Sequence, residues 1–493
     1  MKKLFLPLLL ITILFACKKD VLESNQSATL HFSNDTIIFD TAFHSIGTPT
    51  QTLTIYNRNN FTVLTDISLK LISGGSFRMN VDGVAGNNHI AIEIPAKDSI
   101  FIFLEVTPNQ NSSNDFLLTS NIEFTTGTKK QDVKLVSPAR NANFHLPHDN
   151  IFTDGTDSIN YKYFSISENT TWTNDLPHVI YGYVVIEPNA TLTIEEGTKI
   201  YFHNNSGMFV GNPILIDENG NPPSNNGTLI INGKLGNEVT FQGDRLDIWY
   251  ENIPGQWNGI HFVQGSVENK IDYAIISNGI TAIRVDSFVE NQTVTINNTI
   301  IENMSSIGIL GQGANIEVNN TIISKCGQYT LACNIGGTYK FTHCTFANYW
   351  NYNNRNTPSI LLNNYYEGAD GNIYDRGLLA ANFTNCIIDG SLSTEVSFQQ
   401  QAGEFNYTFD HCLIKLDPAI DTDNAHYENV IINQSPKFKD NTESDFHLTE
   451  DSPSVDAGSS DVFDNDFYNI LKTDLDGLDR DLNNPDLGAY EFE

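Results

Sequence analysis

Aromatic and acidic side chains alternate in one stretch of the sequence that has the composition of a ligand-binding loop. It reads YWNYNNRN at 349–356 and NNYYEGADGNIYDRG at 363–377. Aromatic rings offer flat apolar surfaces, and amides and carboxylates exchange hydrogen bonds with hydroxyl groups, so this mixture suits sugar rings. Loops on a rigid scaffold commonly carry such residues. The candidate ligand-binding residues are Trp350, Tyr352, Tyr365, Tyr366, Glu367, Asp370, Tyr374, Asp375 and Arg376. In the alternative interpretation, these aromatic residues only cover the flank of the fold.

A second acidic group lies at 244–251, where Asp244, Asp247 and Glu251 precede Trp257. Two carboxyl groups facing each other across a groove are the acid and base of glycoside hydrolysis. The chain holds 59 acidic residues, so close pairs also arise by chance. The sequence alone therefore assigns no catalytic residue.

Metal sites are weakly indicated. Asp474, Asp476 and Asp479 have a D-x-D-G-x-D spacing that could hold Ca²⁺, but the glycine is misplaced for an EF-hand loop. The pairs His343–Cys344 and His411–Cys412 contain metal-ligand residue types, although neighbouring residues need not share a face. We expect no cofactor, with calcium at the three aspartates as the alternative.

The elements that must position these residues repeat along the chain. Residues 294–303 read VTINNTIIEN, residues 316–325 read IEVNNTIISK, and worn copies begin at residues 269, 339, 381 and 407. Such self-similarity is typical of solenoids. One column of the aligned copies holds only small residues, at spacings of 25, 22, 23, 42 and 26: Ala274, Thr299, Thr321, Cys344, Cys386 and Cys412. The longest step contains the candidate loop.

The repeat predicts a sharp corner within each copy. Strand alternation cannot direct both Ile296 and Ile301 inward, because their separation is odd. The inward–outward alternation of side chains must therefore shift by one residue in each copy. The shift falls at the column formed by Tyr273, Asn298, Asn320, His343, Asn385 and His411. Asn tolerates the left-handed backbone that a one-residue corner needs. A further apolar run in each unit, such as 281–285, supplies a third strand, and stacked coils of this kind form a β-helix.

The three cysteines of the small column are predicted to be apolar filler. Cys344, Cys386 and Cys412 point inward in this alignment, and three aligned thiols cannot all pair. Cys326 and Cys333 are the one pair that remains for a disulfide, across a loop of six residues.

The N-terminus is typical of an exported protein. Lys2 and Lys3 precede an apolar run at 4–15 that is too short to span a bilayer. The sequence LFAC at 14–17 resembles the lipobox of bacterial lipoproteins, which implies a signal peptide at 1–17, a lipidated Cys17 and a tether at 18–27. The alternative is an ordinary signal peptide with an incidental cysteine. A lipid anchor predicts attachment to the outer membrane at the cell surface.

The charge limits the partners. The chain has 27 basic and 59 acidic residues and a net charge of −32, which becomes −32 − 2 = −34 when the two lysines of the signal are removed. Nucleic acid is excluded as a partner because it needs a basic surface. A polyanionic polysaccharide would be repelled unless calcium or a local basic patch intervened, which argues against a polyuronate lyase.

The rest of the chain divides by pattern. Residues 28–140 contain about eight short alternating runs separated by turn residues, which favours an immunoglobulin-like β-sandwich. A connector at 141–180 leads to a β-helix at 181–429 and a capping segment at 430–493. A solenoid needs such a cap on its open edge. In this cap, Asp456, Arg480 and Glu491 are candidates for a buried polar cluster.

Several phrases carry a family resemblance. The run LTIEEGTKIYF at 192–202, the repeats, and DSPSVDAG at 451–458 resemble right-handed parallel β-helix proteins of the pectate-lyase-like class. FDTAFHSIGT at 39–48 and FRMNVDG at 77–83 resemble cell-surface lipoproteins of Bacteroidota. The resemblance implies an all-β fold, in which an N-terminal β-sandwich precedes a right-handed parallel β-helix (solenoid) with a C-terminal cap. The handedness rests on the resemblance alone.

The resemblance transfers no catalytic residue. We hypothesise a lipid-anchored, non-catalytic surface protein that holds a glycan or a protein partner on the flank of the β-helix. One alternative is a polysaccharide-degrading enzyme, either a glycoside hydrolase or a lyase, acting on an extracellular glycan. The other alternative is a purely structural surface spacer. Fold alone does not decide among them.

Overall fold

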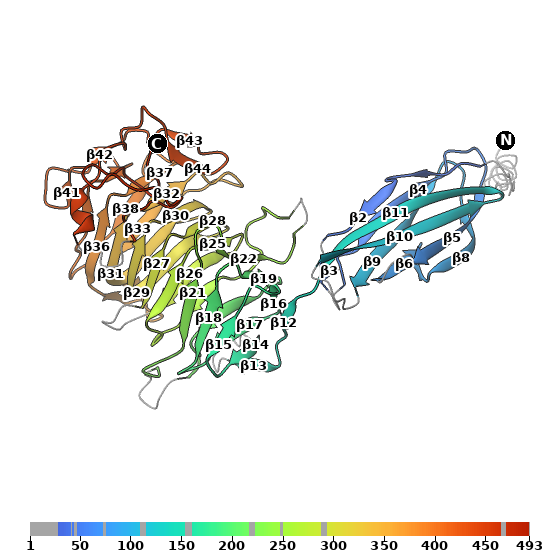
Figure 1. Cartoon of the computed structure of the whole chain (residues 1–493), viewed down its shortest axis with the longest axis horizontal. Helices are drawn as coiled ribbons and strands as arrows, with labels where there is room; N and C mark the ends of the chain where they lie inside the picture. Colours follow the sequence, from blue (N-terminus) through green and yellow to red (C-terminus); the bar gives the residue numbers. More distant parts are fainter. Residues whose placement is uncertain are drawn as a thin grey trace, which may run out of the picture. The chain divides into compact units, whose positions relative to one another are not determined.

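The computed structural model describes residues 28–40, 42–43, 47–71, 75–108, 115–152, 160–215, 222–246, 250–286, 293–464 and 470–492. The signal segment, Cys17 and the tether lie outside these residues. The chain forms two compact units, Met1–Ala142 and Asn143–Glu493 (Figure 1). No helix in the described ranges is both long and apolar enough to cross a membrane.

The first unit is a β-sandwich. One sheet is ordered β1(His31–Phe32), β4(Gln51–Tyr56), β9(Ser99–Pro108), β6(Gly75–Val81) and β7(Val84–Ala85). The other is ordered β2(Thr36–Ile38), β11(Lys129–Arg140), β10(Asp115–Thr126), β5(Val63–Leu71) and β8(Asn88–Ile94), with β3(Ala42–Phe43) beside β11. Ile100, Ile102 and Leu104 are buried in the shared core, and Phe101 and Phe103 between them are exposed. This period of two is what places a strand between a core and solvent.

The second unit is a parallel β-helix whose strands fall into three sets, which we call faces 1, 2 and 3 in chain order. Face 3 is a single sheet of eleven parallel strands. Its strands are β12(Asn143–His145), β16(His178–Ile180), β19(Lys199–Phe202), β22(Val239–Gly243), β25(Ala274–Ser277), β28(Ile300–Met304), β30(Ile322–Cys326), β32(Thr345–Asn348), β37(Ile387–Gly390), β40(Leu413–Ile414) and β42(Ile431–Ile432).

Faces 1 and 2 share the 18-stranded sheet. Face 1 contains β14(Asn160–Ile166), β17(Tyr183–Ile186), β20(Gly207–Val210), β23(Ile260–Phe262), β26(Thr281–Asp286), the first parts of β29(Ile307–Asn319) and β31(Leu331–Thr342), β33(Ile360–Asn363) and β38(Val396–Gln399). Face 2 contains β15(Thr170–Trp172), β18(Thr191–Glu195), β21(Thr228–Asn232), β24(Asn269–Asp272), β27(Val294–Asn297), the second parts of β29 and β31, β36(Leu378–Thr384), β39(Thr408–Asp410) and β41(Tyr427–Glu428). β13(Asp149–Phe152) pairs antiparallel with β14.

Residues 141–180, expected to be a connector, already contain strands of the solenoid. β12 and β16 pair with each other on face 3, β14 pairs with β17, and β15 pairs with β18. The stacked coils therefore begin before residue 181. The early coils carry no clear copy of the repeat, which is why the pattern alone places their start too late.

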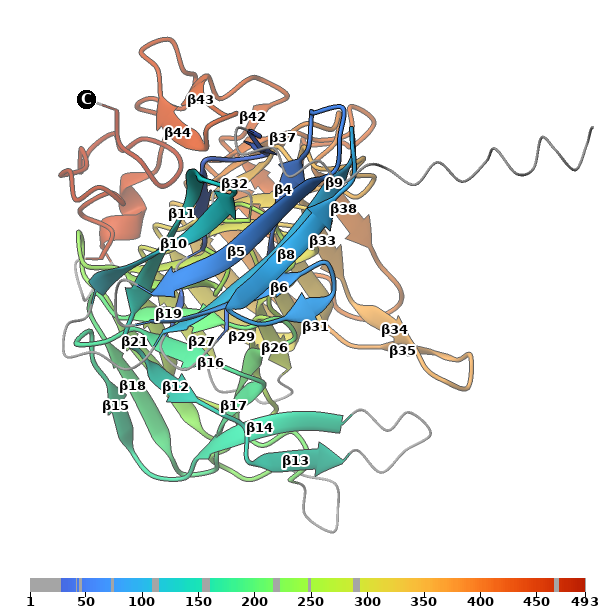
Figure 2. The ribbon, with the colours of Figure 1, turned by 90° about the vertical axis from the view of Figure 1, so that its right-hand side faces the viewer.

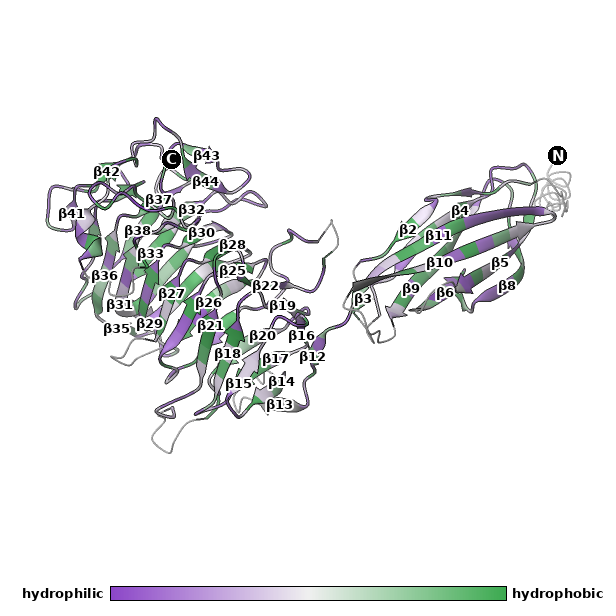
Figure 3. Ribbon diagram, in the orientation of Figure 1, coloured by the Kyte–Doolittle hydropathy of each residue, from purple (hydrophilic) through white to green (hydrophobic). Residues whose placement is uncertain are grey.

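In-register apolar columns form the core. On face 2 the column Ile271, Ile296, Val318, Phe341, Phe383 and Phe409 is in register from coil to coil and fully buried. The phenylalanine rings of this column stack at 4.7 and 4.8 Å. Figure 3 shows hydrophobic and hydrophilic positions alternating along these strands. Repeated apolar residues thus line the inside of every coil.

The predicted one-residue corner is confirmed. The corner residues Tyr273, Asn298, Asn320, His343, Asn385 and His411 have φ between 46° and 54°, in the left-handed region. The residue after each corner then faces inward, and Cys344, Cys386 and Cys412 are fully buried there. The five described cysteines are free and buried, so the prediction of a thiol column without disulfides is also confirmed.

The C-terminal segment lies on the outer side of face 3. Ile322 and Ala347 of face 3 pack with Phe446, Leu475 and Ala489. A second cluster joins Ile387 and Leu413 of face 3 to Leu448 and Leu487. The segment contains the hairpin β43(Phe438–Asp440)–β44(Asp445–Leu448) and the 3₁₀ helix η1(Ser460–Phe463). These contacts place the cap along the flank of the stacked coils, whereas the sequence had suggested the open edge of the last coil.

Candidate functional site

The candidate loop of residues 349–377 is divided between two corners of the β-helix. Residues 349–359 connect β32 on face 3 to β33 on face 1. Residues 364–377 connect β33 to β36 on face 2 and contain the hairpin β34(Tyr365–Glu367)–β35(Ile373–Asp375). The aromatic residues of the two parts therefore belong to different edges of the coil and do not form one surface.

The hairpin projects from the stacked coils (Figure 2). Tyr366 and Tyr374 are partners across its strands, and their rings stack at 5.2 Å. The Tyr374 hydroxyl donates to Asp370 Oδ2 at 2.7 Å, and this hydrogen bond lowers the pKa of Asp370. Arg376 lies 6.0 Å from the Tyr366 ring centre. Glu367 and Asp375 are exposed and Tyr365 is partly buried. The hairpin is held mainly by its own side chains.

The first part of the loop is anchored by buried contacts. Trp350 is buried, and its indole Nε1 donates to Asn353 Oδ1 at 2.9 Å. Arg355 and Glu395 form an ion pair at 2.6 Å with 1% and 0% of their side chains exposed. Arg355 also donates to the Asn348 carbonyl at 2.8 Å. Trp350 and Arg355 therefore fix the loop, and Tyr352 is the aromatic residue of this part that reaches the surface.

Tyr352 helps to line a groove of about 310 Å³ on face 3, which we call the face-3 groove. Its lining is almost entirely polar: Gln242, Glu251, Asn252, Ile275, Ser277, Asn278, Glu302, Asn303, Lys325, Asn351 and Tyr352. Glu251 from the second acidic group and Tyr352 from the candidate loop thus meet although about 100 residues separate them.

The floor of the groove follows from the strand register. Ser277, Glu302 and Ser324 are register partners on β25, β28 and β30. Each precedes an asparagine or lysine with positive φ, namely Asn278, Asn303 and Lys325. The coils are about 4.8 Å apart, so one polar side chain per coil lies on the outer side of this row. Ser277 and Glu302 line the groove, whereas Ser324 is buried. The repeat copies contain a signal for this site, since Glu302 stands between Ser277 and Ser324 in this column.

The walls of the groove are tied to the floor by hydrogen bonds. Asn278 Nδ2 donates to the Glu251 carbonyl at 2.7 Å, and Asn303 Nδ2 donates to the Asn252 carbonyl at 2.7 Å. The Tyr352 hydroxyl donates to the same Asn252 carbonyl. On the opposite side, Lys325 Nζ donates to the Thr442 carbonyl at 2.8 Å, in the turn of the C-terminal hairpin. Three separate segments therefore meet at one groove.

The two glutamates of the groove differ in environment. Burial raises the pKa of Glu302, and the nearby Lys325 charge and a hydrogen bond with Ser444 offset only part of this effect. Glu251 is exposed at the rim. A carboxyl group with a raised pKa beside an exposed one can exchange hydrogen bonds with hydroxyl groups as both donor and acceptor.

Asp244 of the second acidic group does not line this groove. Asp244 Oδ2 forms a 2.8 Å contact with His203 Nδ1, and this hydrogen bond raises the pKa of His203. Asp247 lies outside the described residues. Nearness in the sequence therefore does not bring Asp244 and Glu251 into one site.

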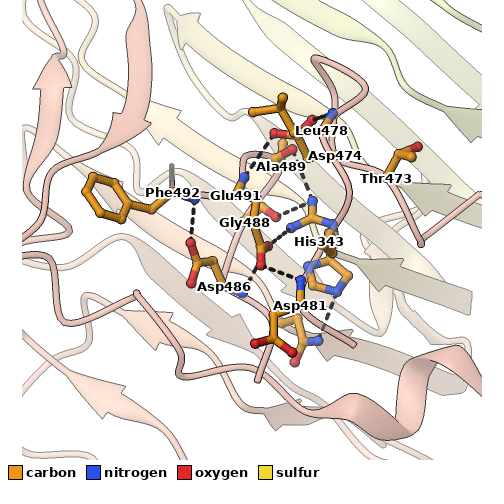
Figure 4. Close-up of polar contacts among 12 residues, drawn as sticks. His343, Thr473, Asp474, Leu478, Asp481, Asp486, Gly488, Ala489, Glu491 and Phe492 are labelled. Carbon is orange, nitrogen blue, oxygen red and sulfur yellow. Dashed lines mark hydrogen bonds and ion pairs between the residues drawn. The ribbon is translucent and has the colours of Figure 1, made fainter. Parts of the chain in front are cut away.

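The three aspartates proposed for calcium are directed elsewhere. Asp474 Oδ1 accepts from the backbone N–H group of Asp476. It also accepts from that of Leu478, and Oδ2 accepts from that of Glu491 (Figure 4). Asp476 binds His447 Nε2 at 2.9 Å, and Asp479 is exposed. Over the described ranges, no three His, Cys, Asp or Glu residues gather in an arrangement able to hold a metal ion.

A buried polar cluster does form around Arg480. Its Nη1 donates to Glu491 Oε2 at 3.0 Å, as the sequence suggested. Asp456 is exposed, and its backbone N–H donates to Asp486 Oδ1 at 2.7 Å. Asp486 is the carboxylate that sequence reasoning missed. Burial raises its pKa to about 6 despite two hydrogen bonds from backbone N–H groups.

Comparison with known proteins gives only distant likenesses. No protein-family model matches the chain, and no curated protein matches its sequence. A PapD-like domain of human CEP192 is 10% identical, with 25% of this chain and 92% of that chain covered, at a TM-score of 0.18. A family 123 glycoside hydrolase from Clostridium perfringens is 11% identical, with 24% of this chain covered at a TM-score of 0.19, and this chain spans only 29% of its length.

A third solved structure is the catalytic domain of a GH87 alpha-1,3-glucanase in complex with nigerose. It is 10% identical, with 73% of this chain and 92% of that chain covered, at a TM-score of 0.18. Likenesses this distant assign no activity to the chain. The fold and the site define the class directly, as a β-sandwich unit and a parallel β-helix with a polar groove on its third face.

Proposed function

We propose that the chain is an exported, lipid-anchored protein of the cell surface whose β-helix binds a neutral glycan in the face-3 groove without cleaving it. The observation that carries this proposal is the lining of the groove. Amide, hydroxyl, carboxyl and ammonium groups from four successive strands of face 3 and the adjoining loops line the groove together with one exposed tyrosine ring. Sites for hydroxyl-rich rings need such convergent polar groups beside an aromatic surface.

The charge of the groove favours a neutral ligand. Its lining contains the two glutamates Glu251 and Glu302 and the single basic residue Lys325. The whole chain has a net charge of −32, so a polyanion approaching this groove is repelled. Hydroxyl groups of a neutral sugar pair with carboxylates, amides and an ammonium group without that penalty.

The N-terminal sequence supports the cellular setting. The positive residues, the short apolar run and LFAC at 14–17 resemble a bacterial lipoprotein signal, and FDTAFHSIGT at 39–48 resembles cell-surface lipoproteins of Bacteroidota. In this proposal the β-sandwich unit, which we take as immunoglobulin-like, is a spacer between the anchor and the β-helix. A protein partner on the same flank is the alternative occupant.

The test uses the full chain in detergent and a panel of neutral and acidic polysaccharides in affinity electrophoresis. We expect retention by a neutral polymer, with affinity reduced on the order of tenfold in Tyr352→Ala and in Glu302→Gln. Tyr374→Ala on the hairpin is the matched control and should keep full affinity. If all three variants bind as tightly as the parent chain, the face-3 groove is not the binding site. Thermal unfolding of each variant separates lost binding from lost folding.

A second candidate function, polysaccharide hydrolysis, is favoured by one observation. Glu302, with its raised pKa, and the exposed Glu251 line the same groove, as an acid and a base would. Size-exclusion chromatography of the incubated panel distinguishes the two functions. If the parent chain shortens a polymer, and Glu302→Gln and Glu251→Gln do not, the chain is an enzyme. Retention of a polymer whose length does not change supports binding. If no polymer is retained or shortened, the remaining function is that of a structural spacer.

A further inference from the structure

A second hollow, of about 340 Å³, lies on face 1, away from the groove considered above. It is lined by Tyr183, Met208, Phe209, Pro213, Ile214, Asn258, Gly259, Ile260, His261, Thr281 and Arg284. These residues come from four successive strands, β17, β20, β23 and β26, and from the segments that precede and follow them. No residue of this hollow stood out in the sequence, because face 1 has no repeated polar motif.

Strand register aligns the key side chains of the hollow. Phe209, His261 and Arg284 are register partners on β20, β23 and β26. Each lies between two buried residues that point into the core, which are Met208, Val210, Ile260, Phe262, Ile283 and Val285. Strand alternation therefore directs the three partners outward, about 4.8 Å apart from coil to coil.

One wall of the hollow is a fixed aromatic surface. The Tyr183 ring stacks on Phe209 at 4.7 Å between ring centres. Asn258 Nδ2 donates to the Tyr183 hydroxyl at 2.5 Å. Gly207 leaves room for this ring, because a Cβ there would lie 2.9 Å from the ring carbon Cε1. Ile214 extends the apolar surface at the rim, where 45% of it is exposed.

The other end of the hollow contains two basic side chains that share one carboxylate. Arg284 donates from Nε and Nη2 to the two carboxylate oxygens of Asp286, at 3.0 and 2.8 Å. His261 Nε2 contacts Asp286 Oδ2 at 2.8 Å. Burial alone would raise the pKa of Asp286, but the bonds with His261 and Arg284 lower it below its usual value. Asp286 thus holds both basic side chains in place. It accepts hydrogen bonds from two of the five N–H groups of the Arg284 guanidinium.

The hollow is a local exception in an acidic chain. Among the described residues that line it, His261 and Arg284 are basic and none is acidic. The chain as a whole has 59 acidic and 27 basic residues. An apolar ring surface beside a positioned guanidinium suits a ring that carries one carboxylate, since Arg recognises carboxylates through paired N–H donors.

We propose that the face-1 hollow binds a single sugar ring bearing a carboxylate, that is, a terminal uronic acid unit. The apolar face of the ring lies on Tyr183, and its carboxylate accepts hydrogen bonds from the guanidinium N–H groups of Arg284 that Asp286 does not use. The volume lies at the low end of the roughly 300–1,000 Å³ of small-ligand pockets, so the hollow fits one ring rather than a chain. This inference goes beyond the proposed function, because it assigns an acidic ligand to a different face.

The experiment titrates the full chain in detergent with methyl glucuronoside and with methyl glucoside, by calorimetry or ligand-observed NMR. We expect the glucuronoside to bind on the order of tenfold more tightly than the neutral glucoside, and Arg284→Gln to remove that preference. The proposal would be overturned if the parent chain did not bind the glucuronoside at about 10 mM. It would also be overturned if the chain bound both sugars equally.

A second variant keeps the test valid if Arg284→Gln fails to fold. Ile214→Glu places a negative charge on an exposed rim position and should abolish glucuronoside binding. Ile90→Glu, at a site 80% exposed in the β-sandwich, is the matched control and should bind like the parent chain. Tyr352→Ala in the face-3 groove should also leave this binding unchanged, so failure here is distinguishable from failure of the proposed glycan site. Glucuronoside binding by Ile214→Glu at parent affinity would contradict the site.

Discussion

Arg480 donates a hydrogen bond from Nη2 to Oδ1 of Asn320 at 3.2 Å, although 160 positions separate the two residues. Asn320 is one of the left-handed corner residues, and its Nδ2 donates to the carbonyls of Ile470 and Thr473, each at 2.8 Å. The same side chain therefore turns the coil and holds the C-terminal segment against face 3. The two roles are compatible because a corner residue with positive φ directs its polar side chain out of the coil.

Replacing Arg480 with Ala should destabilise the β-helix strongly. Arg480 is buried and paired with Glu491, and its removal leaves that carboxylate without its partner. Breaking a buried pair in this way costs about 3–5 kcal/mol. The matched control is Arg78→Ala, because Arg78 and Glu105 form a 3.0 Å pair with 59% and 40% of their side chains exposed, which is worth about 0–1 kcal/mol. Urea unfolding followed by circular dichroism measures both, and equal losses would contradict the assignment.

The corner column makes a prediction about backbone preference. Asn298 has φ of 49°, and its Oδ1 accepts a hydrogen bond from Asn320 at 3.2 Å. Asn298→Val adds left-handed strain of about 1–2 kcal/mol to the loss of this bond. Asn298→Gly loses the bond but adopts the conformation freely, so it should be the more stable variant. The reverse order in chemical denaturation would show that the side-chain contact, and not the corner, dominates.

Two histidines at the start of the β-helix predict a loss of stability in acid. His145 Nε2 and His178 Nδ1 are 2.9 Å apart, and both rings stack on Trp172. Burial lowers the pKa of His145 to about 3, with a further contribution from the His178 charge, and burial lowers that of His178 to about 4. The unfolded chain has the ordinary value of about 6.5, so it takes up protons first as the pH falls.

Stability from this pair should be complete above about pH 6.5. It should decline from about pH 6.5 down to about pH 4 for His178 and about pH 3 for His145, by at most about 1.4 kcal/mol per pH unit for each histidine. The measurement is the free energy of unfolding against pH. The double variant His145→Gln, His178→Gln should have a shallower slope in this window, while carboxylates contribute equally to both proteins. Identical slopes would show that the two imidazoles titrate normally in the folded state.

The buried thiols should resist modification. Cys326, Cys333, Cys344, Cys386 and Cys412 are free and buried, and burial raises the pKa of Cys326 to about 12 and that of Cys386 well above its usual value. Thiolate is the reactive form, so a disulfide reagent should leave these five unmodified until urea unfolds the chain. An added cysteine at an exposed position, Gln400→Cys, should react at once. Rapid native reaction of the five would contradict the closed core.

The comparison of sequence with structure is clearest at residue 302. The repeat places Glu302 in an outward column beside serines, and this much could be predicted from the copies alone. That Glu251 and Tyr352 reach the same groove could not, because both lie in insertions without repeat register. The hairpin aromatics Tyr366 and Tyr374 show the opposite error, since nearness to Tyr352 in sequence suggested a common surface that the coil geometry separates.

The sequence by itself determined the stacked coils, the inward apolar columns and the left-handed corners, because these depend on alternation, period and the φ preference of single residues. Only the tertiary structure decided where unrepeated segments lie. Arg480 reaches Asn320, and Asp286 joins His261 to Arg284, through strand register and side-chain packing between residues distant in sequence. Local patterns fix a coil, whereas a site on its flank depends on which coils and insertions become neighbours.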